Sequence, residues 1–375
     1  MGPLHFGAGF FLIEVLKLKN MSECPLISKS FVTLNQVFAT DPSFFTGTLQ
    51  ANGYFHLPFV YGGYNLKTLA KNINNQLPSF LVILFACCTI TVSADDHRRS
   101  DTTPLSTGKQ AIAFLEKQAD LRPSNYWPNV NPVFFLQNLR KNIDEPLSIH
   151  EGKSTNFCAY AALSYIPLHD DPLGFVKFLV KIYKEGKAIY GKEYFEPSKE
   201  VKLAAGTLTF KGELDVRPAD QLWFMLLADH FKGYLNFFDK QYNPGDENRL
   251  WASVNFAKYN RMIRRLFNYE VSAVGSDLFK PGIRDMYEYL SEKLATGTVS
   301  LFVNNVNLYK RNQTRLKFGV PTHFVILLAI EEVDNKIAIT YWDYGGRTRL
   351  LLTERFLKKT LFGISHATKK TANAQ

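Results

Sequence analysis

The chain has 375 residues, of which 46% are hydrophobic, so it can bury a large core and form two or three domains. Its 44 Lys and Arg against 34 Asp and Glu give a net charge of +10, spread without a block of like charges. Such a surface permits weak attraction to a cell wall, membrane or nucleic acid, but no motif predicts specific reading of nucleic acid. The sequence also lacks Gly-x-Ser-x-Gly, paired Cys-x-x-Cys and His-Glu-x-x-His motifs. Their absence argues against serine hydrolases, structural zinc sites and zinc proteases.

Residues 1–76 are rich in Asn, Thr, Gly and Phe without a sustained period, which predicts a poorly ordered segment or small appendage. An over-extended gene model, with translation starting near Leu66 or Leu69, is the alternative. The polar stretch 95–106 is expected to be a linker.

Residues 77–94 have the parts of a secretory signal. Lys67 and Lys71 precede an uncharged apolar run over 80–92, and small residues close it before Asp95. The run is too short for a comfortable membrane span, so we expect no transmembrane segment in the mature chain. We predict an exported protein (periplasmic, outer-membrane lipoprotein or secreted) that begins near Asp95 or at a lipid-modified Cys87. A buried core strand or helix is the alternative reading of this run.

From residue 107 onward we expect one domain, 107–375. Asp171 and Pro172 predict an N-cap and first helical position, and Gly186 predicts the end of that helix. A small hairpin is expected within 203–217. Further helices are predicted at 111–119, 134–139, from 158 onward, 219–232, 246–268 and 281–295. The stretch of about 172–295 thus reads as a helical insertion.

The character of the sequence changes after Gly297, where period-two alternation begins. Strands are predicted at 298–303, 323–331, 337–342, 347–352 and 363–367, with a short helix at 353–361. Helices first and an antiparallel sheet afterwards predict an α+β fold.

Cys158 is the cysteine best placed for chemistry, at the start of a predicted helix that Ser154 or Thr155 would cap. A thiol in the first turn meets unpaired N–H groups and the positive end of the helix dipole, and both favour thiolate. His323 and Asp343 follow on adjacent predicted strands, which completes a thiol hydrolase arrangement. Taken singly, each of these three residues also has an interpretation without catalysis: a buried core cysteine, a core histidine and an aspartate in a turn.

His323 and Asp343 can meet only if they project from the same face of the sheet, and the connecting loop decides this. A two-residue loop at Asp334-Asn335 would point them to opposite faces. A three-residue loop beginning at Val333 would make them same-face diagonal neighbours. We therefore predict the three-residue loop, or a bulge if the loop has two residues.

Three segments carry a family resemblance: Asn156-Phe157-Cys158-Ala159-Tyr160-Ala161-Ala162, Thr322-His323-Phe324-Val325-Ile326-Leu327 and Ile339-Thr340-Tyr341-Trp342-Asp343-Tyr344-Gly345. Together they resemble the papain-like cysteine peptidase superfamily, in particular bacterial branches related to bacteriocin-processing peptidases and secreted effector proteases. The resemblance implies a nucleophile helix packed on a C-terminal antiparallel sheet. It also implies Cys158 as nucleophile, His323 as base and Asp343 as the orienting acid.

The chain departs from this pattern before the cysteine, where many members carry a Gln whose amide helps to bind the oxyanion. The nearest amide is Asn156, which we assign to the oxyanion site beside the Cys158 N–H. The expected function is cleavage of a peptide or amide bond in a peptide, protein or cell-wall substrate, with no cofactor and no metal. An inactive binding protein on the same scaffold and a cell-wall peptide amidase or transferase stay open, as does the oligomeric state.

Overall fold

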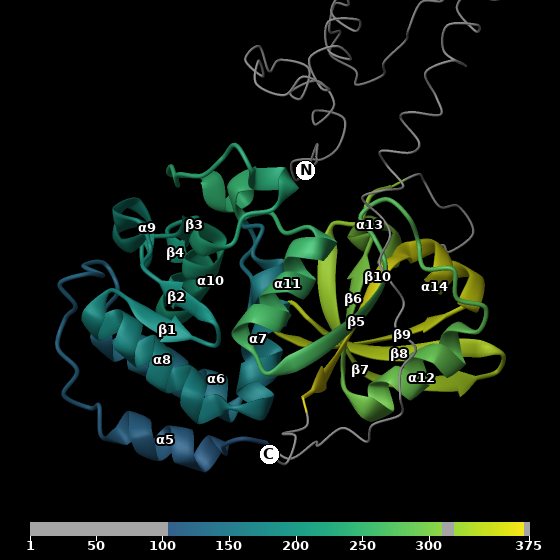
Figure 1. Ribbon diagram of the computed structural model, residues 1–375, viewed down its shortest axis with the longest axis horizontal. Helices are drawn as coiled ribbons and strands as arrows, with labels where there is room; N and C mark the ends of the chain where they lie inside the picture. The colour runs from purple at the N-terminus through teal and green to yellow at the C-terminus, as the bar shows by residue number, and fades with distance from the viewer. Residues whose placement is uncertain (1–103, 310–318, 371–375) are drawn as a thin grey trace, which may run out of the picture. The chain divides into compact units, whose positions relative to one another are not determined.

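A six-stranded antiparallel sheet forms one side of the molecule, and a group of helices forms the other (Figure 1). The computed structural model describes residues 104–309 and 319–370. The strand order is β5-β10-β6-β7-β8-β9. The strands are β5 (Tyr269–Gly275), β6 (Thr298–Val303), β7 (His323–Val333), β8 (Lys336–Asp343), β9 (Gly346–Leu352) and β10 (Leu361–Lys369). The predicted α+β class is confirmed at this level.

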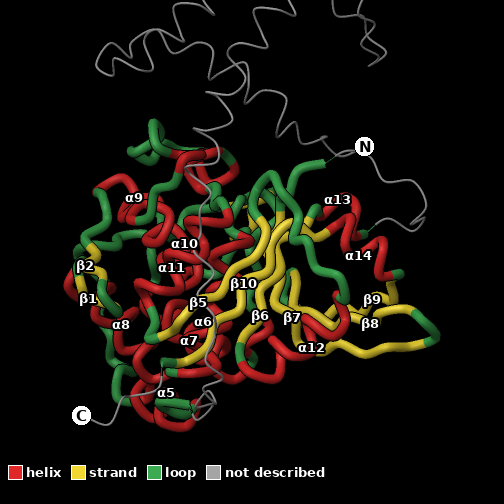
Figure 2. Tube along the Cα trace, turned by 45° about the vertical axis from the view of Figure 1, so that its right-hand side comes forward, coloured by secondary structure: helices red, strands yellow, loops and turns green. Residues whose placement is uncertain are grey.

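Alternating apolar residues let the sheet bury both of its faces. On β7, Phe324 and Ile326 join one core cluster, whereas Val325 and Leu327 join the other. Helices α7 (Cys158–Asp170) and α11 (Phe256–Leu266) contribute to the first cluster. Helices α12 (Met286–Thr296) and α14 (Glu354–Thr360) contribute to the second. Figure 2 shows the strongly twisted sheet with helices around it.

The helices on the other side of the molecule come mainly from the first half of the described chain (Figure 1). Asp171 caps the helix α8 (Pro172–Glu185) by accepting a hydrogen bond from the Gly174 N–H, and Gly186 ends this helix in the left-handed conformation, as predicted. These helices are α5 (Gly108–Glu116), α6 (Pro132–Asp144), α8 (Pro172–Glu185), α9 (Lys199–Ala204) and α10 (Pro218–His230). Short 3₁₀ turns are η2 (Pro146–Ser148), η3 (Tyr234–Asn236), η4 (Asp246–Asn248) and η5 (Leu250–Ala252). Two small hairpins are β1 (Ala188–Tyr190) with β2 (Glu193–Phe195) and β3 (Thr209–Phe210) with β4 (Glu213–Leu214).

The β7–β8 hairpin has a two-residue loop, so the predicted three-residue loop is wrong and the alternative, a bulge, is found. Val333 pairs with Lys336, and Asp334 and Asn335 both have positive φ, which suits a tight hairpin turn. The register then shifts between Leu327 and Ala329, leaving Leu328 as the extra residue. Beyond the bulge, each β7 residue projects from the face opposite to the one that it would occupy in an uninterrupted ladder with β8. His323 and Asp343 thereby come to one end of the sheet on matching sides.

Three other expectations need correction. The predicted helix at 246–268 is broken into η4, η5 and α11, because Asn255 caps a new helix. The helix predicted from residue 281 begins at Met286 instead, where Asp285 accepts a hydrogen bond from the Glu288 N–H. The stretch 172–295 also contains β5, which pairs with β10 as an edge strand of the sheet. The expectations for 1–76, for 77–94 and for 95–103 of the linker lie outside the described residues.

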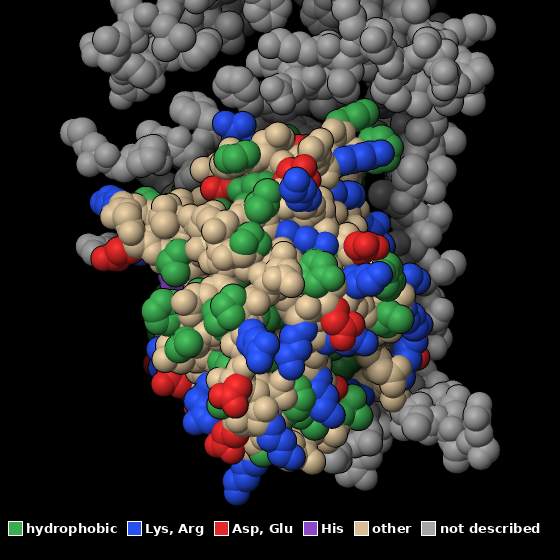
Figure 3. Space-filling view, turned by 90° about the vertical axis from the view of Figure 1, so that its left-hand side faces the viewer, with side chains coloured by type: hydrophobic (Ala, Val, Ile, Leu, Met, Phe, Trp, Pro, Cys, Tyr) green, Lys and Arg blue, Asp and Glu red, His purple; other side chains and the backbone are tan. Residues whose placement is uncertain are grey.

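Positive side chains are dispersed over the face of the described residues that Figure 3 shows. On the face drawn in Figure 3, Lys and Arg lie among hydrophobic and acidic side chains and form no single block, in line with the sequence pattern. Within 104–309 and 319–370, every helix is either too short or too polar to cross a membrane.

Candidate active site at the end of the sheet

Cys158 is the first residue of α7, and its side chain is partly exposed. The residue before it, Phe157, is the N-cap but has no capping side chain, so the predicted cap by Ser154 or Thr155 is wrong. Both hydroxyls are used elsewhere: Ser154 donates to Asp215 at 2.6 Å, and Thr155 donates to a backbone carbonyl within its own loop. The first-turn N–H groups at Cys158 therefore lack a side-chain cap.

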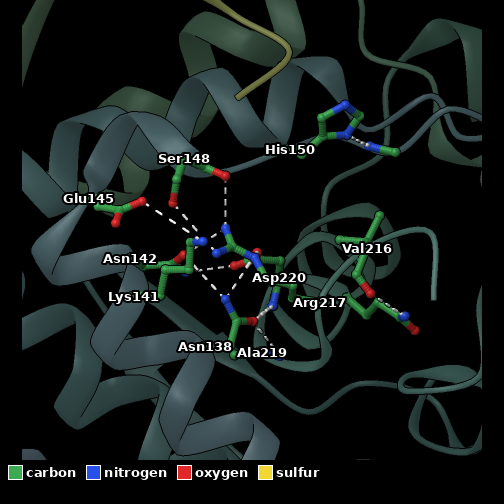
Figure 4. Close-up of polar contacts among 12 residues, drawn as sticks. Asn138, Lys141, Asn142, Glu145, Ser148, His150, Val216, Arg217, Ala219 and Asp220 are labelled. Atoms are coloured by element: carbon green, nitrogen blue, oxygen red, sulfur yellow. Dashed lines mark hydrogen bonds and ion pairs between the residues drawn. The ribbon is translucent and has the colours of Figure 1, made fainter. Parts of the chain in front are cut away.

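The segment leading to Cys158 is fixed by contacts with several elements. The Arg217 guanidinium, paired with the buried Asp220, donates to the Ser148 carbonyl at 3.0 Å (Figure 4). Asp215 accepts hydrogen bonds from the Lys153 and Ser154 N–H groups at 2.9 and 3.0 Å. The loop that leads to the candidate nucleophile (the nucleophile loop, residues 145–157) is thus held to α10 and to the segment just before it.

His323 joins Cys158 and Asp343 through a single imidazole ring. Its Nε2 lies 2.5 Å from Asp343 Oδ1, and its ring also makes a side-chain hydrogen bond with Cys158. Because Nε2 is taken by the carboxylate, Nδ1 is the ring nitrogen left for the bond to the sulfur. The Cys158 Sγ also lies 3.8 Å from the Thr322 carbonyl oxygen. The structure therefore brings together the three residues singled out in the sequence.

Electrostatics favour the protonated ring. Burial by itself would lower the pKa of His323, but the hydrogen bonds and charges of Asp343 and Cys158 outweigh it and raise that pKa to about 10. An imidazolium between a carboxylate and a sulfur atom is the state expected for an ion pair with a thiolate.

Two tyrosines flank this group. The Tyr344 ring stacks on the His323 imidazole, with centroids 4.9 Å apart and an interplanar angle of 16°. The Tyr309 hydroxyl donates to Asp343 Oδ2, the oxygen that His323 does not use. Burial and this hydrogen bond raise the pKa of Tyr309, which keeps its proton in place as a donor. Both carboxylate oxygens of Asp343 are therefore engaged.

Asn156 is placed differently from the other three predicted residues. Its side-chain amide donates to the Arg249 carbonyl at 3.1 Å, and its backbone N–H donates to the Glu247 carbonyl at 2.7 Å. Its assignment to the oxyanion site stays a prediction, whereas the helix start places the Cys158 N–H beside the sulfur.

Glu151 is the residue of this site that the sequence did not reveal. It is 2% exposed, its Oε1 lies 3.9 Å from His323 Nε2, and neither of its carboxylate oxygens has a hydrogen-bond partner among the described residues. Burial raises the pKa of Glu151 to about 7, with the charge of His323 acting in the opposite direction. A lone Glu in a loop rich in polar residues carries no periodic or motif signal. Its position 7 residues before the cysteine was the only available hint.

Glu151, His323 and Asp343 could each offer one atom to a metal ion, since those atoms lie within 4.8 Å of one another and all three residues are buried. Two carboxylates and an imidazole suit Zn²⁺ in ligand type. The 2.5 Å contact between Nε2 and Oδ1 is shorter than the spacing of two ligands about 2.0–2.2 Å from a tetrahedral ion, however. The geometry as it stands fits a hydrogen-bonded pair better than a metal centre.

Comparisons of the chain with protein-family models, with curated proteins and with solved structures found no match in any of the three.

Proposed function

We propose that this protein is a papain-like thiol hydrolase that cleaves a peptide or amide bond through Cys158, His323 and Asp343. The observation that carries the proposal is the imidazole of His323, which hydrogen bonds to a helix-terminal thiol on one side and to a buried carboxylate on the other. This is the linkage that nucleophile, base and orienting group require.

The chemistry follows from the contacts. His323 holds the proton that Cys158 releases, so the thiolate can attack the substrate carbonyl carbon and form a carbon–sulfur bond. The Cys158 N–H at the start of α7 would donate to the oxyanion and stabilise it. When the carbon–nitrogen bond breaks, His323 returns its proton to the leaving amine. Water activated by the neutral imidazole then hydrolyses the thioester and frees the thiol.

This chemistry requires a substrate with a peptide or amide bond. Such a substrate could be a peptide, a protein or a cell-wall peptide. A cell-wall amidase or transferase would use the same three residues, and a transferase would replace water with an amine in the second step. An inactive binding protein is the alternative from a different class, and the bond of the Asn156 amide to the Arg249 carbonyl, away from the assigned oxyanion role, favours it.

A thiol-directed active-site probe separates the hydrolase from the binding protein. We expect it to label Cys158 in the wild-type chain, and we expect His323→Ala to abolish the labelling because the thiol loses its base. The matched control is His169→Ala, an exposed histidine on the same helix, which should label normally. Equal labelling of wild type and His323→Ala would favour an inert thiol and the binding protein.

We also propose that the protein is exported, on the basis of the signal-like segment 77–94. Intact-mass measurement of protein from the native host should give a chain that begins near Asp95 or at a lipid-modified Cys87. A mature chain that retains residues 1–76 would contradict export through this segment.

A further inference from the structure

Glu151 is a buried carboxyl group for which the triad chemistry provides no role. Within 104–309 and 319–370, both of its carboxyl oxygens are buried and without a hydrogen-bond partner, and a buried unpaired polar group of this kind costs free energy. The loop that carries it is nevertheless built to keep it there. The Thr155 hydroxyl donates to the Glu151 carbonyl, and the Gly152 N–H donates to Nδ1 of His150 at 2.8 Å.

The titratable groups that face Glu151 lie on neighbouring elements. His323 at the start of β7 is the nearest, with Nε2 3.9 Å from Oε1. Asp343 at the end of β8 lies in the same cluster, and Tyr344 after β8 is influenced by the Glu151 charge. Two carboxyl groups therefore compete for one imidazole nitrogen. Only Asp343 lies within hydrogen-bond distance of it.

The number of charges decides which carboxyl group is ionised. In the ion-pair state that the proposed function requires, the Cys158 thiolate, the His323 imidazolium and the Asp343 carboxylate sum to one negative charge beside the buried Glu151. A second ionised carboxylate would add another without gaining a hydrogen bond, which is costly at low dielectric. A neutral Glu151 removes this cost.

We propose that Glu151 is a positioning residue that acts as a neutral carboxylic acid, leaving the His323 imidazolium paired with Asp343 alone. When Glu151 loses its proton to solvent, a second carboxylate stands beside Nε2 and holds the imidazolium more tightly. His323 then becomes a weaker acid toward the leaving amine, so hydrolysis slows. This role rests on the proposed function, because it acts through the proton transfers of the same site.

The test measures the protonation of Glu151 and of His323 in the full chain. Infrared difference spectra between about pH 6 and about pH 8.5 should show the loss of a carboxylic acid C=O band that Glu151→Gln lacks. The His323 imidazole resonance, assigned with His323→Gln, should inflect at the same midpoint near pH 7 in the wild type. Glu151→Gln, which mimics the neutral acid, should remove this inflection, while the exposed Glu332→Gln should retain it.

A kinetic readout completes the test, with each rate of probe-substrate hydrolysis normalised to the same variant at about pH 6. The wild-type rate should fall severalfold above neutral pH, whereas Glu151→Gln should show no such fall. The same inflection in both chains, or a missing acid band, would overturn the proposal. So would removal of the band by one equivalent of Zn²⁺ at neutral pH, since Glu151 would then be a metal ligand. If Cys158 is not labelled at any pH, the proposed function fails, but the shared inflection still reports the Glu151–His323 coupling.

Discussion

Trp342 donates its indole N–H to the Leu147 carbonyl at 2.8 Å, and these residues lie 195 positions apart in the sequence. The bond joins the end of β8, one residue before Asp343, to the nucleophile loop that leads to Glu151 and Cys158. The relative position of Asp343 and Cys158 thus depends on a contact outside the three candidate site residues.

Replacing Trp342 with Phe should lower both stability and probe labelling of Cys158. The variant leaves a carbonyl without its donor, which costs about 1–3 kcal/mol in the free energy of unfolding. Denaturant unfolding measures the first effect and labelling rate the second. Trp127→Phe is the matched control, because Trp127 donates a bond of the same length to the Ile182 carbonyl away from the site. Equal labelling rates for the two variants would contradict a role for the Trp342 bond in the site.

Asp343→Asn should lower the pKa of His323 from about 10, because burial, which lowers it, is no longer opposed by this carboxylate. A raised pKa in the folded state stabilises the protein only while the ring is protonated. That stabilisation is fully present below about pH 6.5 and is lost as the pH rises through about 10. The difference in unfolding midpoint between wild type and Asp343→Asn should therefore narrow as the pH rises over this range.

The control for that measurement is Asp120→Asn, an exposed position that should show no pH-dependent difference. A gap that widens toward alkaline pH would mean that the His323–Asp343 pair does not hold a proton in the folded state.

Gly152→Ala should destabilise the nucleophile loop by more than the cost of placing Ala in the left-handed backbone conformation. Gly152 has φ +92°, and a Cβ there would lie 2.8 Å from both Asp215 Oδ2 and Val216 Cγ2. Gly212 has a similar φ of +85° but open space around it, so Gly212→Ala isolates the backbone cost of about 1–2 kcal/mol. Thermal unfolding should show a larger loss for Gly152→Ala, and only this variant should label slowly. Equal losses would show that the loop adjusts to the Cβ.

Asn335→Ala should destabilise the β7–β8 hairpin by about 1 kcal/mol, because Asn335 adopts φ +57°, which Asn and Gly tolerate better than Ala. Asn335→Gly should be neutral or stabilising. Glu332→Ala, in the adjacent extended segment, serves as the control. The measurement is the free energy of unfolding of the three variants. An Asn335→Ala variant as stable as the wild type would argue against the tight two-residue turn.

The sequence predicted the C-terminal sheet well because its strands alternate and turn residues separate them. The predicted strand at 298–303 matches β6 residue for residue, and the helix at 353–361 contains α14. Strand β5 was not predicted, because Tyr269–Gly275 follows a helical pattern directly and becomes a strand only by pairing with β10.

Two features of the site depended on tertiary contacts that no local pattern reveals. The Ser154 hydroxyl is drawn away from the expected cap by Asp215, a residue distant in the sequence. Glu151 comes close to His323 and Asp343 only when β7 and β8 pack against its loop. The same-face relationship of His323 and Asp343 was expected because the two residues had to meet, and counting residues required either a three-residue loop or a bulge. The structure has the bulge and places it at Leu328.

The bridge between α7 and the start of β7 spans 164 positions from Cys158 to Thr322. Contacts this distant in sequence form late in folding, after the large entropic cost of closing the intervening chain has been met. A nascent or unfolded chain therefore carries a cysteine with ordinary thiol chemistry. On the proposed function, the rate at which Cys158 gains reactivity during refolding would report completion of the whole domain, with no substrate required.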